Sequence, residues 1–248
     1  MGQPILAAAG FRPALGELKF VGNFKLAHRR LKGGCGQDRP PHDSWQYTCE
    51  VMQLSTSMFD VVHRLTTPVS TTSFTLGVCP VHGGQTAAKL AAAIAVAAAR
   101  SSPCKILLME FTRGDPLLAG MFGIPPMAPG LFEMLAKAPH NRFDTIHPTE
   151  HKNLFVLPAG GFGHRRRFTP TRQQMEWTHR VTSPHFAGVV MELPPMGELR
   201  AREFCHHIPN AVVLVAAPGR VGAWSVRRAV RRLQQAEANL VGSVLSEG

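Results

Sequence analysis

Runs of branched apolar residues alternate along the chain with stretches whose apolar residues recur every three or four positions. Uninterrupted apolar runs are typical of strands buried on both faces, and the periodic stretches are typical of amphipathic helices. The expected strands are FTLGV (74–78), KILLM (105–109), NLFVLPAG (153–160), FAGVVMELPP (186–195) and NAVVLVAAPG (210–219), with a closing apolar segment at 239–245. The expected helices are 45–65, an Ala-rich helix after the glycine loop that follows the first strand, 130–138 and 224–238. This alternation predicts a three-layer α/β fold, in which helices cover both faces of a mostly parallel sheet.

The chain divides into two parts by composition. Residues 1–44 are rich in Gly, Pro and basic residues and are expected to form a flexible extension, whereas 45–248 form one domain. The most apolar run, 90–99, is about half of the ~20 residues that a membrane span needs. Residues 1–18 lack the basic and apolar blocks of a signal peptide. We therefore expect a cytoplasmic protein, and a peripheral position at the inner face of the plasma membrane stays open.

The five cysteines are an odd and scattered set, typical of reduced thiols rather than a disulfide framework. Cys205, His206 and His207 are adjacent, but adjacent side chains rarely point to one ion, and no second Cys/His pair stands at zinc-type spacing. A metal site is not expected there.

The formal net charge is +11 and the isoelectric point is near 10.2, which favours an anionic partner such as nucleic acid, a membrane surface or an acidic protein tail. Two arginine clusters stand out: Arg165, Arg166 and Arg167, and then Arg227, Arg228, Arg231 and Arg232. The second cluster falls at helical spacing opposite Val226, Val230 and Leu233. It is either a solvated helix face or a surface for an anionic partner, and the sequence leaves both open.

The strongest candidate for chemistry is the segment CPVHGGQTAAKL, between the first strand and the Ala-rich helix. This is the place of a phosphate-binding P-loop, G-x-x-x-x-G-K-[ST]. On that spacing the two glycines, the lysine and the hydroxyl fall at Cys79, Gly84, Gln85 and Thr86. A register one residue later places Thr86 at the lysine. Gly83 and Gly84 would keep a backbone cradle, but the phosphate-binding lysine is absent in either register.

Several motifs follow one another in a recognisable order. They are VHGGQTA (81–87), LLMEFTRGDP (107–116), GLFEML (130–135), NLFVLPAG (153–160), MELPP (191–195), VVLVAAPG (212–219) and LVGSVL (240–245). From residue 45 to 248 this order resembles the bacterial tyrosine kinases (BY-kinases) of capsule and exopolysaccharide synthesis, within the wider ParA/MinD-like P-loop ATPases. The resemblance implies an ATP or ADP site with Mg²⁺, at Gly83, Gly84, Gln85 and Thr86 for the nucleotide and at Glu110 and Glu192 for the metal.

The positions that carry chemistry depart from the family pattern. The lysine is Gln85 or Thr86, and the three acidic positions carry Glu110, Thr112 and Glu192 where the family has aspartates. Mg²⁺ demands near-ideal octahedral geometry, so a longer side chain at two positions would misplace the carboxylates. Glu110 and Glu192 either hold a metal or are buried acids that accept hydrogen bonds from loop N–H groups. Tyr47 is the single tyrosine, which argues against self-phosphorylation in the family's manner.

These departures indicate a catalytically degraded protein that acts as a scaffold or regulator of polysaccharide synthesis and export. By resemblance, its partner would be the cytoplasmic segment of a membrane-bound co-polymerase or export protein, with a homo-oligomer also open. Two alternatives stay open as well. One is a slow switch that still binds ATP, and the other is a ParA-like protein whose basic face binds DNA non-specifically.

Overall fold

The computed structural model of the chain describes residues 18–20, 73–111, 117–136, 143–161, 170–198, 201–217 and 219–246. The expected helix at 45–65, the domain boundary at 44/45, the arginines at 165–167 and the residue at 112 lie outside these ranges. The predictions that concern them therefore stay predictions.

The central layer is an eight-stranded sheet with the order β1-β8-β7-β2-β6-β3-β5-β4. The strands are β1 Leu18–Phe20, β2 Phe74–Pro80, β3 Ile106–Glu110, β4 His147–Pro148, β5 Leu154–Leu157, β6 Gly188–Glu192, β7 Ala211–Ala216 and β8 Leu240–Ser246. The six inner strands are parallel, while β1 and β4 pair antiparallel at the two edges. All six apolar segments expected as strands lie in this sheet, and the mostly parallel arrangement is confirmed.

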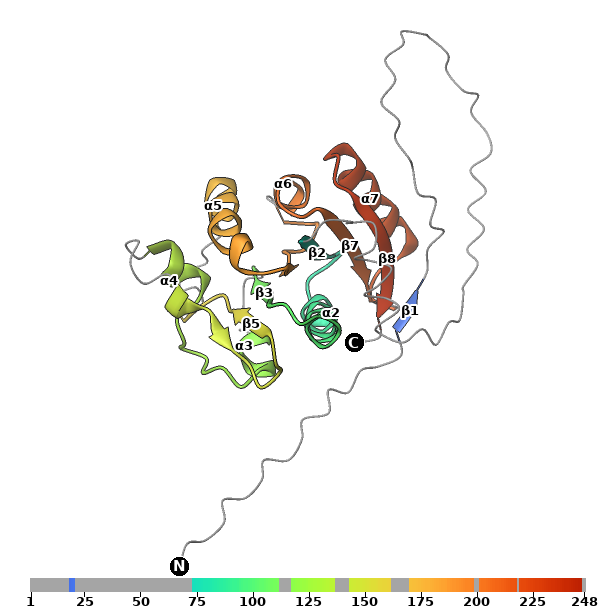
Figure 1. Ribbon diagram of the computed structural model, residues 1–248. Coiled ribbons are helices and arrows are strands. Elements are labelled where there is room, and N and C mark those ends of the chain that lie inside the picture. The colour runs from blue at the N-terminus through green and yellow to red at the C-terminus, as the bar shows by residue number, and fades with distance from the viewer. Residues whose placement is uncertain are drawn as a thin grey trace, which may run out of the picture.

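Helices cover both faces of the sheet (Figure 1). On one face lie α2 Thr86–Ser101 and α3 Leu117–Met121, and on the other lie α4 Leu131–Ala136, α5 Arg172–Thr182, α6 Ala201–His207 and α7 Ala223–Gln235. Short 3₁₀ helices η2 Phe143–Thr145 and η3 Ser183–His185 lead into β4 and β6. The three-layer α/β prediction is confirmed.

Each face has its own apolar core, because successive residues of a strand point to opposite sides. Alternate residues of β3 show the division: Ile106 and Leu108 pack with the alanines of α2, whereas Leu107 and Met109 pack with α4–α7. Alanine is a strong helix former and its small side chain lets α2 lie close to the sheet. Helix α2 is consequently buried along ten of its residues.

The hydrophobic pattern of the sequence does not predict helix α5. Its N-terminus is fixed by a capping box, in which the Thr171 hydroxyl accepts from the backbone N–H of Gln174 and the Gln174 side chain accepts from the backbone N–H of Thr171. Only Met175, Thr178 and Thr182 of this helix are buried. Among the described residues, no helix combines the length and apolar character needed to cross a membrane.

Candidate functional site

The segment expected to carry chemistry leaves the middle of the sheet. Strand β2 lies between β6 and β7, and backbone hydrogen bonds extend this pairing past its end: Val81 N–H donates to the carbonyl of Val215 at 2.9 Å, and Met196 N–H to that of Pro80 at 2.9 Å. The chain then turns into α2. In open α/β sheets ligands bind at this carboxyl edge of the strands. The fold therefore places the predicted P-loop segment where a ligand site is expected.

The turn itself is open to solvent. Residues 82–85 are exposed and Thr86, the first residue of α2, is half-buried. Gly84 has φ +149°, which side-chain-bearing residues rarely adopt, so the turn needs glycine at this position. A Cβ at Gly84 would find no atom within 4 Å, and one at Gly83 would find only Pro195 Cγ, at 3.8 Å. The nearest lysine in sequence, Lys89, is exposed and lies one helical turn inside α2.

Glu110 and Glu192 end two neighbouring strands and are paired in register. Because directly paired residues point to the same side of a sheet, both side chains lie on the face that α2 covers, as does Val78, the partner of Glu192 on β2. Both are buried, with 2% and 1% of their surface exposed. The structure thus brings the two predicted metal-site acids together beneath the loop.

The carboxylate of Glu110 already has hydrogen-bond donors on both oxygens. The backbone N–H of Leu118 donates to Oε1 at 3.2 Å, and that of Ala159 donates to Oε2 at 3.1 Å. These donors come from the start of α3 and from the loop after β5, so Glu110 ties two segments to the end of β3. This is the arrangement expected of a buried structural acid.

Solved structures with the same architecture include bacterial tyrosine kinase domains and MinD ATPases. The chimerical protein CapA2B2 superposes with a TM-score of 0.65 at 19% identity, covering 81% of this chain and 86% of that one. The kinase domain of the Escherichia coli tyrosine kinase ETK gives 0.62 at 21% identity, with 76% and 75% covered. The cell division ATPase MinD of Pyrococcus furiosus gives 0.58 at 18% identity, with 69% and 70% covered.

The chain has the fold of the BY-kinases and the MinD-like P-loop ATPases. The resemblance expected from the order of the sequence motifs is therefore confirmed at the level of fold. No family model matches the sequence, and no curated protein matches it.

A thiol pair lies beside the end of β2, where the predicted P-loop segment begins, and sequence reasoning missed it. Cys79 belongs to β2 itself rather than to the loop, and it is fully buried, as is Cys205 of α6. A hydrogen bond with Cys205, together with burial and the nearby charge of Glu192, raises the pKa of the Cys79 thiol. Cys79 Sγ also donates to the carbonyl of Pro194 at 3.4 Å. A buried, protonated thiol is inert, so this pair joins β2 to α6 by packing.

Among the described residues, the acids and cysteines at the edge of the sheet do not form a metal site. Within the described ranges, no group of three His, Cys, Asp or Glu side chains could hold a metal ion. Mg²⁺ prefers several oxygen ligands and retains waters, whereas Glu110 is buried and bonded to two backbone N–H groups. The described residues of this edge do not fit the Mg²⁺ that the resemblance implies.

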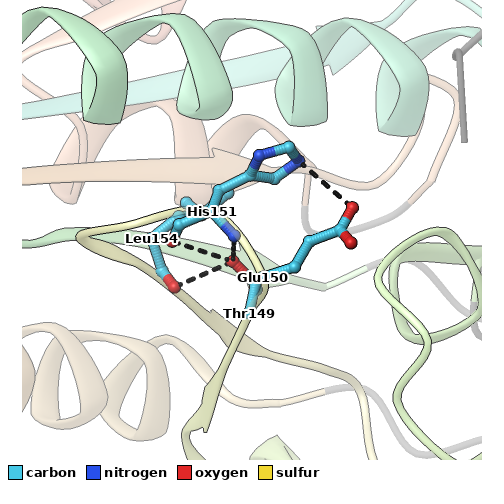
Figure 2. A network of polar contacts seen from close by, with 4 residues as sticks. All are labelled: Thr149, Glu150, His151 and Leu154. Carbon is cyan, nitrogen blue, oxygen red and sulfur yellow. Dashed lines mark hydrogen bonds and ion pairs between the residues drawn. The ribbon is translucent and has the colours of Figure 1, made fainter. Parts of the chain in front are cut away.

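A cavity of about 460 Å³ lies at the opposite, amino edge of the sheet. It is lined by residues 99–103, at the end of α2, and 150–153, before β5. Figure 2 shows the turn that forms one wall: Thr149 Oγ1 donates to the carbonyls of His151 and Leu154 and accepts from the N–H of His151, while Glu150 lies 3.9 Å from the His151 ring. These bonds hold the turn between β4 and β5, and no predicted site residue lies there.

The second arginine cluster lies on α7, as predicted. Arg227, Arg228 and Arg231 are exposed, while Ala229 and Leu233 on the other side of the helix are buried against the sheet. Arg232 differs from the other three, because it is half-buried and its Nη1 donates to the carbonyl of Met196 at 3.0 Å. Sequence reasoning missed Trp224, which begins the same surface and is 68% exposed.

Proposed function

We propose that this chain is a BY-kinase-like protein with a degraded nucleotide site, which acts as a cytoplasmic scaffold or regulator of bacterial exopolysaccharide or capsule synthesis and export. The partner would be the cytoplasmic segment of a membrane-bound co-polymerase or export protein, which would hold the chain at the inner face of the plasma membrane. The partner and the pathway come from the family resemblance. The structural likeness supports the fold on which they depend.

The observation that carries the proposal is that Glu110 is buried and hydrogen-bonded to two backbone N–H groups. Phosphoryl transfer depends on positioned metal ions and cations that stabilise the phosphates. At this edge Glu110, at the first acidic position of the family pattern, accepts hydrogen bonds from the N–H groups of Leu118 and Ala159. The loop before α2 contains no lysine. Both features favour a fold that is kept for its surface rather than for catalysis.

A slow ATP-binding switch remains the second candidate, because the loop geometry favours it. Gly84 keeps a positive φ, and the space at Gly83 and Gly84 is open. Backbone N–H groups at the start of α2 could still donate hydrogen bonds to phosphate oxygens, and the helix dipole would add to this attraction.

Calorimetric titration with ATP and ADP up to millimolar concentration, with and without Mg²⁺, separates the two. A degraded site predicts no heat of binding to the wild-type chain. Micromolar, Mg²⁺-dependent binding would contradict it and would favour the switch. The variant Gln85→Lys restores a cation at the position of the P-loop lysine. We expect it to gain nucleotide affinity without gaining Mg²⁺ dependence, since Glu110 stays bonded within the fold.

Gly84→Asp tests the same distinction in partner binding. An acidic side chain at Gly84 would repel phosphate and strain the turn, so a switch would lose its nucleotide-dependent change of partner while a scaffold would keep its partner. Gly84→Ala is the matched control, because it adds the strain without the charge. Thermal unfolding of both variants shows whether the turn still forms.

A further inference from the structure

Helix α7 presents arginines that the rest of the described chain leaves without a carboxylate. Arg227, Arg228 and Arg231 are exposed on α7, and Arg220 is exposed in the loop that leads to it. Within the described residues, the ion pairs are Glu150 with His151 and Arg172 with Glu176, and neither involves these four arginines. The sequence contains no Asp or Glu between Glu203 and Glu237. We call Arg220, Trp224, Arg227, Arg228 and Arg231 the α7 basic face.

An exposed tryptophan belongs to this face. Trp224 lies in the first turn of α7 with 68% of its surface exposed, and the guanidinium of Arg228, one turn later, lies 5.2 Å from its ring centroid. A cation over an indole ring is a favourable contact that holds both groups in place at the surface. Indole rings are enriched where an apolar phase meets water, because the ring is apolar and its N–H is polar.

The helix is fixed to the domain by its other side. Ala229 and Leu233 are buried, and Val226 and Val230 pack against the same core. Helix α7 therefore cannot turn its apolar side outward, so its arginines stay on the side that faces solvent. Its N-cap, Gly222, brings no side chain to the first backbone N–H groups, and the first turn contains no acid. The positive end of the helix dipole adds to the charge of the face.

We propose that the α7 basic face binds the anionic phospholipid headgroups of a membrane surface, with Trp224 at the level of the headgroups. Arginine pairs with phosphate through two parallel N–H donors, so a cluster of arginines suits an array of phosphates. The exposed side of a helix is convex. A fluid membrane surface can adapt to this shape, whereas a short acidic peptide would need a groove to bind in. The exposed indole of Trp224 favours lipid over duplex DNA, because the phosphates of DNA offer it no apolar phase.

This inference deepens the proposed function, because it gives the chain a lipid contact of its own beside the protein partner. It rests on the proposed function only for the expectation that the chain lies near the plasma membrane. Vesicles that lack the partner protein test the lipid contact alone. The proposal of a protein partner can therefore be wrong while the lipid contact is confirmed, and the reverse is also possible.

The experiment is sedimentation of the full chain with phosphatidylcholine vesicles, with and without about 30 mol % phosphatidylglycerol. We expect binding only to the anionic vesicles, weakening as salt rises. The triple variant Arg227→Gln, Arg228→Gln and Arg231→Gln should lose affinity on the order of a hundredfold, since each basic residue near an anionic leaflet contributes roughly fivefold. The control is Arg100→Gln, Arg180→Gln and Arg202→Gln, which removes the same charge from exposed arginines elsewhere. It should lose clearly less.

Tryptophan fluorescence gives an independent readout. Emission should shift to shorter wavelength with anionic vesicles, and Trp224→Phe should abolish the shift, whereas Trp177→Phe should keep it because Trp224 remains. Three results would overturn the proposal: no binding to anionic vesicles at low salt, equal losses in the two triple variants, or a duplex DNA that binds the α7 basic face more tightly and displaces the vesicles.

Discussion

The carboxyl edge of the sheet and the α7 basic face treat their charged groups in opposite ways. At the edge, Glu110 and Glu192 are buried, and Glu110 accepts two backbone N–H groups. On α7, Arg227, Arg228 and Arg231 are exposed, and within the described residues none of them pairs with a carboxylate. The family's chemistry would lie at the first region, yet the second is the one whose charges are exposed.

The difference follows from what each environment permits. A buried carboxylate must find donors, because leaving it without them costs several kcal/mol. Once the fold supplies those donors, the acid contributes to stability whether or not a ligand binds. Exposed arginines are under no such constraint and gain little from the fold. Substitutions should therefore change stability at the first region and binding at the second.

The largest expected effect on stability comes from Glu110→Ala. Removing the carboxylate leaves the N–H groups of Leu118 and Ala159 without their acceptor, at roughly 1–3 kcal/mol each, so the free energy of unfolding should fall by about 2–6 kcal/mol. Chemical denaturation in the presence of a chelator measures it. Under that condition a residue kept as a metal ligand would not stabilise the fold.

Two further variants keep this test informative if the alanine variant fails to fold. Glu110→Gln retains one acceptor oxygen and should lose about 1–3 kcal/mol. Glu150→Ala removes a side chain that is 74% exposed and should stay within about 0.5 kcal/mol of wild type. A Glu110→Ala variant as stable as Glu150→Ala would show that the edge acids are not structural.

A smaller effect should separate two adjacent arginines of α7. Arg232 Nη1 donates to the carbonyl of Met196, which fixes the loop after β6, so Arg232→Ala should lower the free energy of unfolding by about 1–2 kcal/mol. Arg231→Ala removes the same charge from an exposed position and should change stability by less than about 0.5 kcal/mol. Equal losses of stability would erase the distinction between the structural arginine and the α7 basic face.

Much of the fold could be predicted from the sequence because its strands are buried on both faces. Most inner strands are largely apolar runs, such as β5 and β7, and the predicted helix at 224–238 closely matches α7. The short helices α3 and α6 and the edge strand β4 were not predicted, since they contain too few residues for a period to appear. For α5 a signal existed in the pair Thr171 and Gln174, the spacing of a capping box.

The candidate site could be predicted only in part, because the sequence shows residue types and not their partners. It placed Glu110 and Glu192 at two strand ends, and the sheet pairs them. It could not show that Leu118 and Ala159, 8 and 49 residues further along the chain, donate to Glu110. Nor could it show that Cys79 and Cys205 meet, or that Arg232 turns inward while Arg231 does not, since these depend on packing between distant segments.

The smallest expected effect is the pH dependence contributed by His179. Its ring Nε2 lies 2.8 Å from Thr75 Oγ1 at the start of β2, and burial lowers the pKa of His179 below its usual value of 6.5. The unfolded chain therefore takes up this proton at a higher pH than the folded chain does. The stabilisation is complete above pH 6.5 and is lost as the pH falls toward the folded-state pKa.

Denaturation at a series of pH values between about 7.5 and 5 measures this contribution as the difference between wild type and His179→Gln. The wild type should lose more stability than the variant as the pH falls, whereas parallel curves would contradict the assignment. Vesicle binding by the α7 basic face should keep the same ratio between wild type and His179→Gln throughout, because arginine stays charged over this range. The stability of the domain would then respond to acid through His179, while binding by the α7 basic face would not.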